Sequence, residues 1–273
     1  MKGYCFRSAA ALAAFLCSVA ASAGGPRWEW RQIDRHCECC TLQTTLFDSP
    51  QSISVLRYDP RHHRTLVAND PAEAADSTSA FGERYGALAA INGSYFNMKA
   101  LTPVTYVKDD RAVEGMTTPD ELFRVDGMVC VKGGKVVISR CDTLSYVSGS
   151  RRYTEAMAAG PVLLLDGQPA RGSWPDEGFY TGRHPRTVIG TGNDGWVYFI
   201  VIDGRFSGQA IGTTIPETLA VAQMLGLKDA LNLDGGGSST LWISGMGVVS
   251  HPYDNHCFDH SGQRIVPNCI LVK

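Results

Sequence analysis

The stretch NLDGGGSSTLW, residues 232–242, puts three glycines and two serines directly behind an acid, at the end of a short apolar run that begins at Ala230. Glycine reaches backbone angles with φ > 0 at no steric cost and lets another backbone or a ligand approach closely. The resulting loop is lined by N–H and hydroxyl donors, an arrangement that suits an anion and particularly a phosphate. A tight structural corner explains the same glycines, so composition alone leaves the two interpretations equal.

Two familiar loop types do not fit this stretch. A nucleotide-binding phosphate loop ends in Gly-Lys-Ser/Thr, and no lysine follows Gly237. A serine nucleophile elbow has the pattern Gly-x-Ser-x-Gly, whereas Ser238 is flanked by Gly237 and Ser239. Nucleotide hydrolysis and serine hydrolysis are therefore not favoured.

Outward from this stretch, short β-type runs alternate with turn signals from about residue 52 onward. Gly133-Gly134 between two such runs predicts a hairpin. The expected strands span residues 53–58, 87–91, 128–131, 135–139, 162–165, 196–202 and 269–272. This pattern predicts an α+β fold: a sheet-rich single domain with a few helices packed on a mixed or mainly antiparallel sheet.

Two helices are expected among these strands, one within residues 73–85 and one that starts at Thr214. The second has a capping box, because Thr214 caps it, Pro216 suits its first turn and Glu217 stands three residues after the cap. Gly226 is expected to end it. Its apolar face is expected to hold Ile215, Leu219, Ala222 and Leu225.

The first 23 residues have the pattern of a signal peptide, with Lys2 and Arg7 before an apolar run and Ala21-Ser22-Ala23 after it. The run is too short for a stable membrane span. We therefore expect a secreted or periplasmic protein, with a signal peptide at 1–23, an N-terminal arm at 24–50 and the main domain at 51–273. The balance of 25 Lys+Arg against 27 Asp+Glu gives no indication of nucleic-acid binding.

Seven of the nine cysteines lie beyond the predicted signal peptide, where an oxidising compartment would favour disulfides. The pairs Cys130–Cys141 and Cys257–Cys269 are plausible, although pairing does not follow from sequence. The cluster at 36–40, His-Cys-Glu-Cys-Cys, resembles a metal site, but no second His/Cys pair follows at zinc-site spacing. Disulfides are the preferred interpretation of this cluster.

Two motifs together resemble a known family: residues 232–240, NLDGGGSST, and residues 91–96, INGSYF. They are similar to the phosphodiester glycosidases related to N-acetylglucosamine-1-phosphodiester α-N-acetylglucosaminidase, the uncovering enzyme. The likeness covers about 85–272. Residues 101–106, LTPVTY, stand where the family commonly has a glycine-rich turn, which leaves the substrate open.

The resemblance implies cleavage of a sugar C1–O bond whose leaving group is a phosphate ester. Such a reaction passes through an oxocarbenium-like state and needs a carboxylate near C1 and donors around the departing phosphate. Asp234 is the first choice for that carboxylate, as nucleophile or charge stabiliser. Glu217 and Asp203 are further catalytic candidates, with helix capping and turn formation as their respective structural alternatives.

Substrate binding is expected from polar side chains and glycines of the same motifs, with a turn or surface role as the alternative for each. Arginines match the paired oxygens of a phosphate. His184 is an acid–base candidate, and Tyr95, Phe96 and Trp242 are candidates for stacking on a sugar. The expected binding residues are Asn92, Gly93, Arg186, Arg205, Asn232, Gly235, Gly236, Gly237, Ser238, Ser239, Thr240 and Arg264.

No cofactor and no metal are expected, although Asp203, Asp234 and Asn232 offer oxygen ligands to a divalent cation such as calcium. The expected activity is hydrolysis of a phosphodiester-linked glycoconjugate. The alternatives are a non-catalytic glycan- or envelope-binding protein on the same fold and a glycosidase that acts on ordinary O-glycosides.

Overall fold

The computed structural model describes residues 26–69, 75–109, 112–141, 145–171, 175 and 177–273. The predicted signal peptide, residues 1–23, lies outside them. None of the described helices combines the length and apolar character that a membrane span requires.

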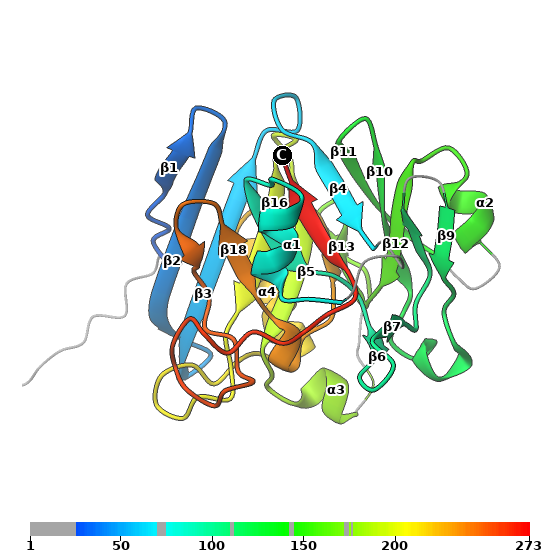
Figure 1. Ribbon diagram of the computed structural model, residues 1–273. Coiled ribbons are helices and arrows are strands. Elements are labelled where there is room, and N and C mark those ends of the chain that lie inside the picture. Colours follow the sequence, from blue (N-terminus) through cyan, green and yellow to red (C-terminus); the bar gives the residue numbers. More distant parts are fainter. Residues whose placement is uncertain (1–25, 70–74, 110–111, 142–144, 172–174, 176) are drawn as a thin grey trace, which may run out of the picture.

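The largest sheet has eight strands, and every neighbouring pair in it is antiparallel. It lies along the left and the back of the molecule in Figure 1. In spatial order its strands are β1 (Arg31–Asp34), β2 (Cys37–Leu46), β3 (Ser49–Tyr58), β16 (Val197–Ile202), β15 (Arg186–Gly192), β17 (Leu227–Asn232), β13 (Val162–Leu165) and β14 (Gln168–Pro169).

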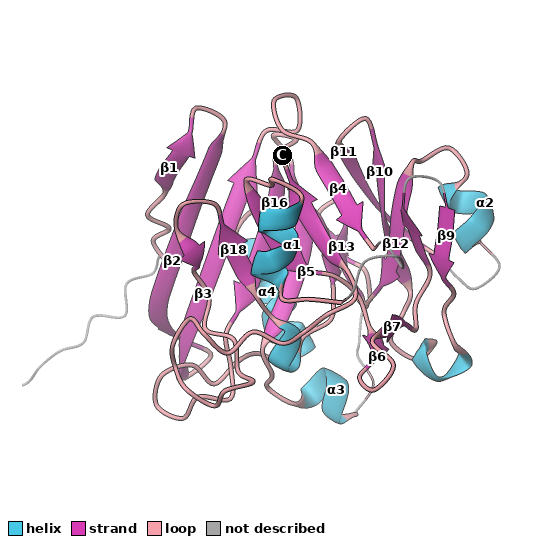
Figure 2. Ribbon diagram, viewed as in Figure 1, coloured by secondary structure: helices cyan, strands magenta, loops and turns pink. Residues whose placement is uncertain are grey.

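Two five-stranded antiparallel sheets accompany the large one. Figure 2 shows the strands in magenta. One has the order β11 (Lys135–Arg140), β10 (Gly127–Lys132), β12 (Glu155–Ala159), β8 (Val107–Asp109) and β9 (Ala112–Gly115). The other has the order β19 (Gly247–Val248), β18 (Leu241–Ile243), β5 (Ala89–Asn92), β20 (Cys269–Val272) and β4 (Thr65–Ala68). A short ribbon pairs β6 (Phe96–Asn97) with β7 (Thr102–Pro103).

The central strand β16 shows why the chain builds two apolar layers. In its sequence, VYFIVI, the tyrosine hydroxyl is the single polar side-chain group, and all six residues are buried. Alternate residues face opposite sides of a strand, so Phe199 joins a core shared with the two smaller sheets and Ile200 joins a second core beneath α4. Each such side chain contributes about 1.5–3 kcal/mol of hydrophobic stabilisation.

The helices are short and cover the sheets. Helix α4 (Ile215–Met224) packs on β13 and β17, and α1 (Thr78–Arg84) packs on β5, β18 and β20. The predicted capping box is present, because Thr214 accepts from the Glu217 N–H and the Glu217 carboxylate accepts from the Thr214 N–H. The other helices are α2 (Tyr146–Ser150), α3 (Gly178–Thr181) and the 3₁₀ turns η1 (Pro119–Glu121) and η2 (Gly236–Ser238).

The predicted sheet-rich α+β class is confirmed, with antiparallel pairing throughout the described sheets. Within the expected N-terminal arm, residues 31–46 form β1 and β2, and β2 pairs along the whole of β3. This part of the arm therefore extends the main sheet.

The structure does not contain the expected disulfides. None of the seven cysteines beyond the predicted signal peptide forms a disulfide in the structure. Cys257 is exposed on a loop while Cys269 is buried in β20, and Cys130 is buried in β10 while Cys141 lies just after β11. The cysteines of the 36–40 cluster lie buried on β2. Spacing along the chain does not fix the Cα separation that a disulfide requires.

Candidate active site

The two sequence motifs meet where β5 and β17 end. Asp234 follows β17, and its backbone N–H donates to the Gly93 carbonyl at 3.1 Å. The Asn92 amide donates in turn to the Asp234 carbonyl at 2.8 Å. Two segments about 140 residues apart in sequence thus fix the backbone of one acid from both sides.

The two candidate asparagines are buried and hold this junction together. The oxygen of Asn92 accepts from the Thr187 hydroxyl and from the Thr240 N–H. The Asn232 amide donates to the Gly160 and Leu233 carbonyls. Both side chains therefore position the loop from beneath, and neither lines the cavity described below.

Each glycine of the triplet has its own structural reason. A Cβ on Gly235 would lie 2.6 Å from the Pro185 carbonyl oxygen, and Gly236 has φ +64°. A Cβ on Gly237 would collide with the ion pair between Asp254 and Arg264. A further close approach occurs at Gly93, where a Cβ would collide with Asn268.

The loop is not the open cradle of N–H donors that its composition suggested. The N–H of Gly235 donates to the Asp234 carboxylate, that of Gly236 to Pro185, and those of Ser238 and Ser239 to carbonyls of the loop itself. The hydroxyls of Ser238, Ser239 and Thr240 are buried, and within the described residues they lack a well-directed hydrogen bond. The glycines instead let arginine side chains and the Pro185 backbone come close.

A cavity of about 210 Å³ lies over the glycine loop. Seven of the predicted site residues line it together: Asp234, the three glycines, Arg186, Arg205 and Arg264. The complete lining consists of Tyr95, Arg124, Phe179, His184, Pro185, Arg186, Arg205, Asp234, Gly235, Gly236, Gly237 and Arg264.

Four guanidinium groups face this cavity, and they differ in their partners. Arg124 pairs with Glu121 at 2.5 Å, and Arg264 forms a two-pronged pair with Asp254. Arg186 donates only to the carbonyls of Thr213, Phe179 and Gly182, and burial lowers its pKa to about 10. Arg205 is exposed. Within the described part of the chain, neither Arg186 nor Arg205 is paired with a carboxylate, so both cations are open to an anion in the cavity.

The Asp234 carboxyl is the one acid in the cavity lining. Burial raises its pKa to about 6, against the opposing effects of Ser238, Arg124, Arg264 and the Gly235 N–H. Part of the side chain still faces the cavity. The group is therefore mostly ionised at neutral pH and is poorly hydrated.

His184 lines the same cavity, between two arginines. Burial and the neighbouring cations Arg186 and Arg205 lower its pKa, so the imidazole is neutral at pH 7. Its Nδ1 lies 3.5 Å from the Arg205 guanidinium. It is placed to orient Arg205.

The other two carboxylates predicted as catalytic lie outside the cavity. Glu217 caps α4 and pairs with Arg183 at 2.5 Å. Asp203 is buried and accepts from the Ser52 hydroxyl and from His251, beside a separate cavity of about 510 Å³ that His251 and His260 help to line. Because these carboxylates are already engaged, their positions support structural roles. Neither Asp203 nor Asn232 lines the cavity that Asp234 faces, so these three oxygen ligands are not gathered there for calcium.

Sequence reasoning missed Arg124 and Phe179. The Arg124 guanidinium lies 3.8 Å above the Tyr95 ring and 5.4 Å from that of Phe179. Arg124 lies in the turn after η1 and Phe179 in the short helix α3. Both are outside the two motifs, where no periodicity or spacing marks them. Of the proposed stacking residues, only Tyr95 lines the cavity, while Phe96 and Trp242 pack beside α1.

Comparison with known proteins identifies relatives of this chain and proteins of similar fold. A curated relative, the SPβ prophage-derived uncharacterized protein YomE of Bacillus subtilis (strain 168), is 30% identical over 155 residues, which are 56% of this chain but only 23% of that protein. The catalytic domain of zebrafish N-acetylglucosamine-1-phosphodiester α-N-acetylglucosaminidase, auto-inhibited by its pro-peptide, has a similar fold, with a TM-score of 0.69 at 17% identity over 89% of this chain and 85% of that one.

A hypothetical protein from Synechocystis is similar with a TM-score of 0.65 at 14% identity, over 91% of this chain and 64% of that one. At these identities the two solved structures establish the fold alone. The model of the phosphodiester glycosidase family matches residues 85–273, which include both motifs and every residue of the cavity. The chain therefore belongs to the phosphodiester glycosidase family.

Proposed function

We propose that this protein hydrolyses a sugar-1-phosphodiester and releases the sugar from a phosphate ester. The observation that carries the proposal is one poorly hydrated carboxylate, Asp234, facing two guanidinium groups without carboxylate partners across a cavity of about 210 Å³. The family and the name of the zebrafish relative support the same activity.

The charges of the cavity suit a phosphodiester. Arg186 and Arg205 contribute two positive charges and Asp234 one negative charge, so the unpaired groups sum to one positive charge. A phosphodiester carries one negative charge and presents two oxygens that a guanidinium can bind together. Arg186 is held by three carbonyls and loses little further freedom on binding.

Asp234 acts on the sugar side. The bond between C1 and the bridging oxygen breaks, its electron pair leaves with the phosphate ester, and positive charge develops on the sugar ring. A carboxylate in a site with little water stabilises such a charge far better than one in bulk solvent. Water supplies the hydroxyl group that C1 receives, and the proton released passes to the phosphate monoester or to solvent.

Asp234→Asn tests this role directly. We expect the variant to fold and to bind a sugar-1-phosphodiester, with turnover lower on the order of 10³-fold, because the amide provides no negative charge. Products are followed by mass spectrometry with a panel of sugar-1-phosphate diesters. Asp166→Asn is the matched control, since Asp166 is an exposed turn residue with φ +49° that asparagine tolerates.

Turnover of Asp234→Asn equal to that of the wild type would remove Asp234 from the mechanism. Retention of a glycan by the wild type without release of a phosphomonoester would favour the binding protein over the enzyme. Release of sugar from ordinary O-glycosides at an equal rate would contradict the role of the two arginines.

We also propose that the protein acts outside the cytoplasm. The proposal is supported by the signal-peptide pattern at residues 1–23. Expression of the full chain in a bacterium, followed by fractionation and N-terminal sequencing, tests it. A soluble cytoplasmic product that retains Met1 would contradict it.

A further inference from the structure

Two turns at the end of the main sheet opposite the cavity meet around His36. One turn joins β1 to β2, and the other joins β3 to β4 (Figure 1). The Asp59 N–H donates to the His36 carbonyl at 3.0 Å, and the Asp59 carbonyl accepts from the N–H groups of His62 and His63. These bonds place His62 directly over His36.

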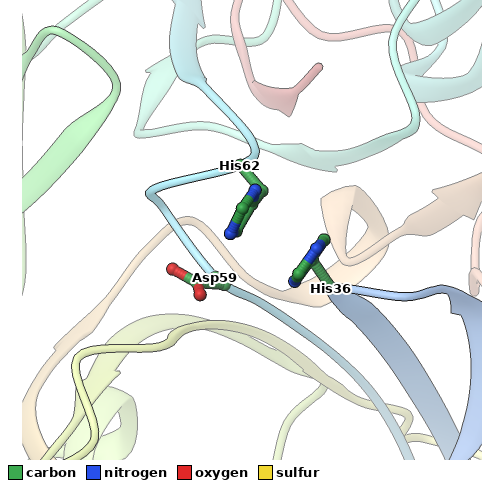
Figure 3. Close-up of side chains that lie close together, drawn as sticks. All are labelled: His36, Asp59 and His62. Carbon is green, nitrogen blue, oxygen red and sulfur yellow. The ribbon is translucent and has the colours of Figure 1, made fainter.

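Three metal-ligand side chains converge there. Ligand atoms of His36, Asp59 and His62 all lie within 4.8 Å of one another. The two imidazole rings stack with centroids 3.5 Å apart and planes inclined by 8°. Figure 3 shows them side by side, with Asp59 at the start of the turn that carries His62. Among the residues that the structure describes, this is the only such group.

The ring nitrogens of this pair are uncommitted, unlike those of most other histidines. His63 pairs with Asp34, His251 with Asp203, and His260 with the Ser250 carbonyl. No described residue donates to or accepts from a ring nitrogen of His36 or His62. Neutral imidazole nitrogens with free lone pairs are the donors that zinc-like cations prefer.

We propose that His36, Asp59 and His62 bind one divalent transition-metal ion of the zinc class. Two imidazole nitrogens and one carboxylate oxygen are a common protein ligand set for Zn²⁺, with the fourth position left to water. Calcium is disfavoured, because it takes six or more oxygen ligands and has no preference for imidazole.

The geometry needs only a local adjustment. Zinc-to-ligand distances of about 2.0–2.2 Å place tetrahedral ligand atoms roughly 3.4 Å apart, and the present atoms lie within 4.8 Å. His62 is exposed, so rotation of its ring opens the stack and turns a lone pair of each ring toward a shared ion. His36 and Asp59 are fixed by the backbone bond that joins their turns.

Arg61 competes with the ion for Asp59. Its side chain binds both carboxylate oxygens at 2.6–3.0 Å, yet that side chain is 74% exposed and free to swing into solvent. A carboxylate offers about four lone-pair sites, so an ion can share the group or displace the guanidinium. Metal affinity should therefore be set partly by Arg61.

The site is remote from the catalytic cavity. Ile53 of β3 pairs with Ile202, which pairs with Arg186 at the cavity end of the sheet, and Tyr58 lies five positions further along β3. At about 3.3 Å per residue this is roughly 17 Å. A bound ion would join the β1–β2 turn to the β3–β4 turn. It would stabilise the hairpin of β1 and β2 without touching substrate.

Titration of the metal-free full chain with ZnCl₂ in a calorimeter tests the proposal. We expect one equivalent to bind and to raise the thermal midpoint. His36→Ala and His62→Ala should each weaken binding by more than the roughly 10- to 100-fold that loss of a supporting residue costs. His260→Ala is the matched control, and CaCl₂ should produce no binding heat.

Arg61→Gln provides a readout that a chance surface site would not give. Removing its charge should tighten Zn²⁺ binding on the order of tenfold, while Arg27→Gln, another exposed arginine next to a carboxylate, should change nothing. Failure of the wild type to bind Zn²⁺, unchanged binding in His36→Ala and His62→Ala, or equal weakening by His260→Ala would each overturn the proposal. Loss of binding in both histidine variants with tighter binding in Arg61→Gln would support it.

Discussion

At the scale of single residues, burial of the Asp234 carboxylate has a cost in stability. Its pKa is raised to about 6 from 3.8, so the folded protein holds this proton more tightly than the unfolded chain does. The free energy of unfolding therefore falls as pH rises from about 4 to about 6, and the full cost is present above pH 6. A shift of about two pKa units corresponds to at most about 3 kcal/mol, and partial contact with the cavity reduces it.

Asp234→Asn should consequently be more stable than the wild type at pH 7.5, by about 1–3 kcal/mol, because it removes the charge and keeps an acceptor for the Gly235 N–H. Near pH 4 the two proteins should have nearly equal stability, since the wild-type side chain is then protonated. Urea unfolding at both pH values measures the difference. A gain of the same size at pH 4 would show that the carboxylate charge is not its cause.

Arg186 and Ser238 should differ in their contribution to binding. Arg186 lines the cavity with an unpaired charge, whereas the Ser238 hydroxyl is buried behind the loop. Calorimetry in the Asp234→Asn background should show affinity weakened about 10- to 100-fold by Arg186→Ala and less by Ser238→Ala. The opposite order would move the phosphate site away from Arg186.

At the scale of elements, the loop from Asp234 to Ser239 is shaped by what packs against it. Gly237 lies against the Asp254–Arg264 ion pair, so a methyl group there must displace the pair from the rim of the cavity. Gly237→Ala should raise KM and leave the α4 and sheet framework intact. Steady-state kinetics and circular dichroism measure the two effects.

Gly149→Ala is the control for this substitution, because a Cβ at Gly149 meets only ordinary contact with Met128. An unchanged KM in Gly237→Ala would mean that the ion pair has no part in binding. A fall in kcat alone, without a change in KM, would place its effect on the reacting groups.

Local sequence signals were sufficient for several elements and insufficient for the complete cavity. The expected strand at 269–272 coincides with β20, and the capping box of Thr214 and Glu217 forms as expected. Both depend on neighbouring residues alone. Arg124 follows η1 and Phe179 lies in α3, and both reach the cavity because sheet packing brings distant segments together. No local pattern records such a contact.

The three carboxylates predicted as catalytic differ in their surroundings for reasons that the sequence does not show. Asp234 stands beside a run of glycines, which led to the prediction that it faces a ligand, and in the structure it lines the cavity. Asp203 ends a buried strand in the same way, but the packed fold supplies it with Ser52 and His251. The hydrogen-bond partners of a buried carboxylate are decided by tertiary contacts.

At the scale of the whole molecule, the domain is larger than the region that the family model matches. That region begins at residue 85, yet β3 pairs with the central strand β16 and β4 pairs with β20. Strand β2 pairs along the free edge of β3, and most of β3 is buried. Strands β3 and β4 are thus part of the core, although they lie outside the segment that the family model matches.

Deletion of residues 1–46 should therefore expose β3 as a long apolar edge and cause aggregation. Deletion of residues 1–25 is the control, since it leaves β1 and β2 in place. Size-exclusion chromatography with light scattering compares the two proteins. A monodisperse product with an unchanged melting temperature after the longer deletion would show that β2 is dispensable.

The position of β20 has a consequence for how the chain acquires its structure. This strand lies between β5 and β4, so the sheet that carries the first motif has a gap until residues 269–272 have been synthesised. Closing it joins segments about 180–200 residues apart, and such distant pairings slow folding because a long loop must be closed first. On the ribosome, the nascent polypeptide should therefore stay sensitive to proteases until residues 269–272 have emerged and paired with β5 and β4.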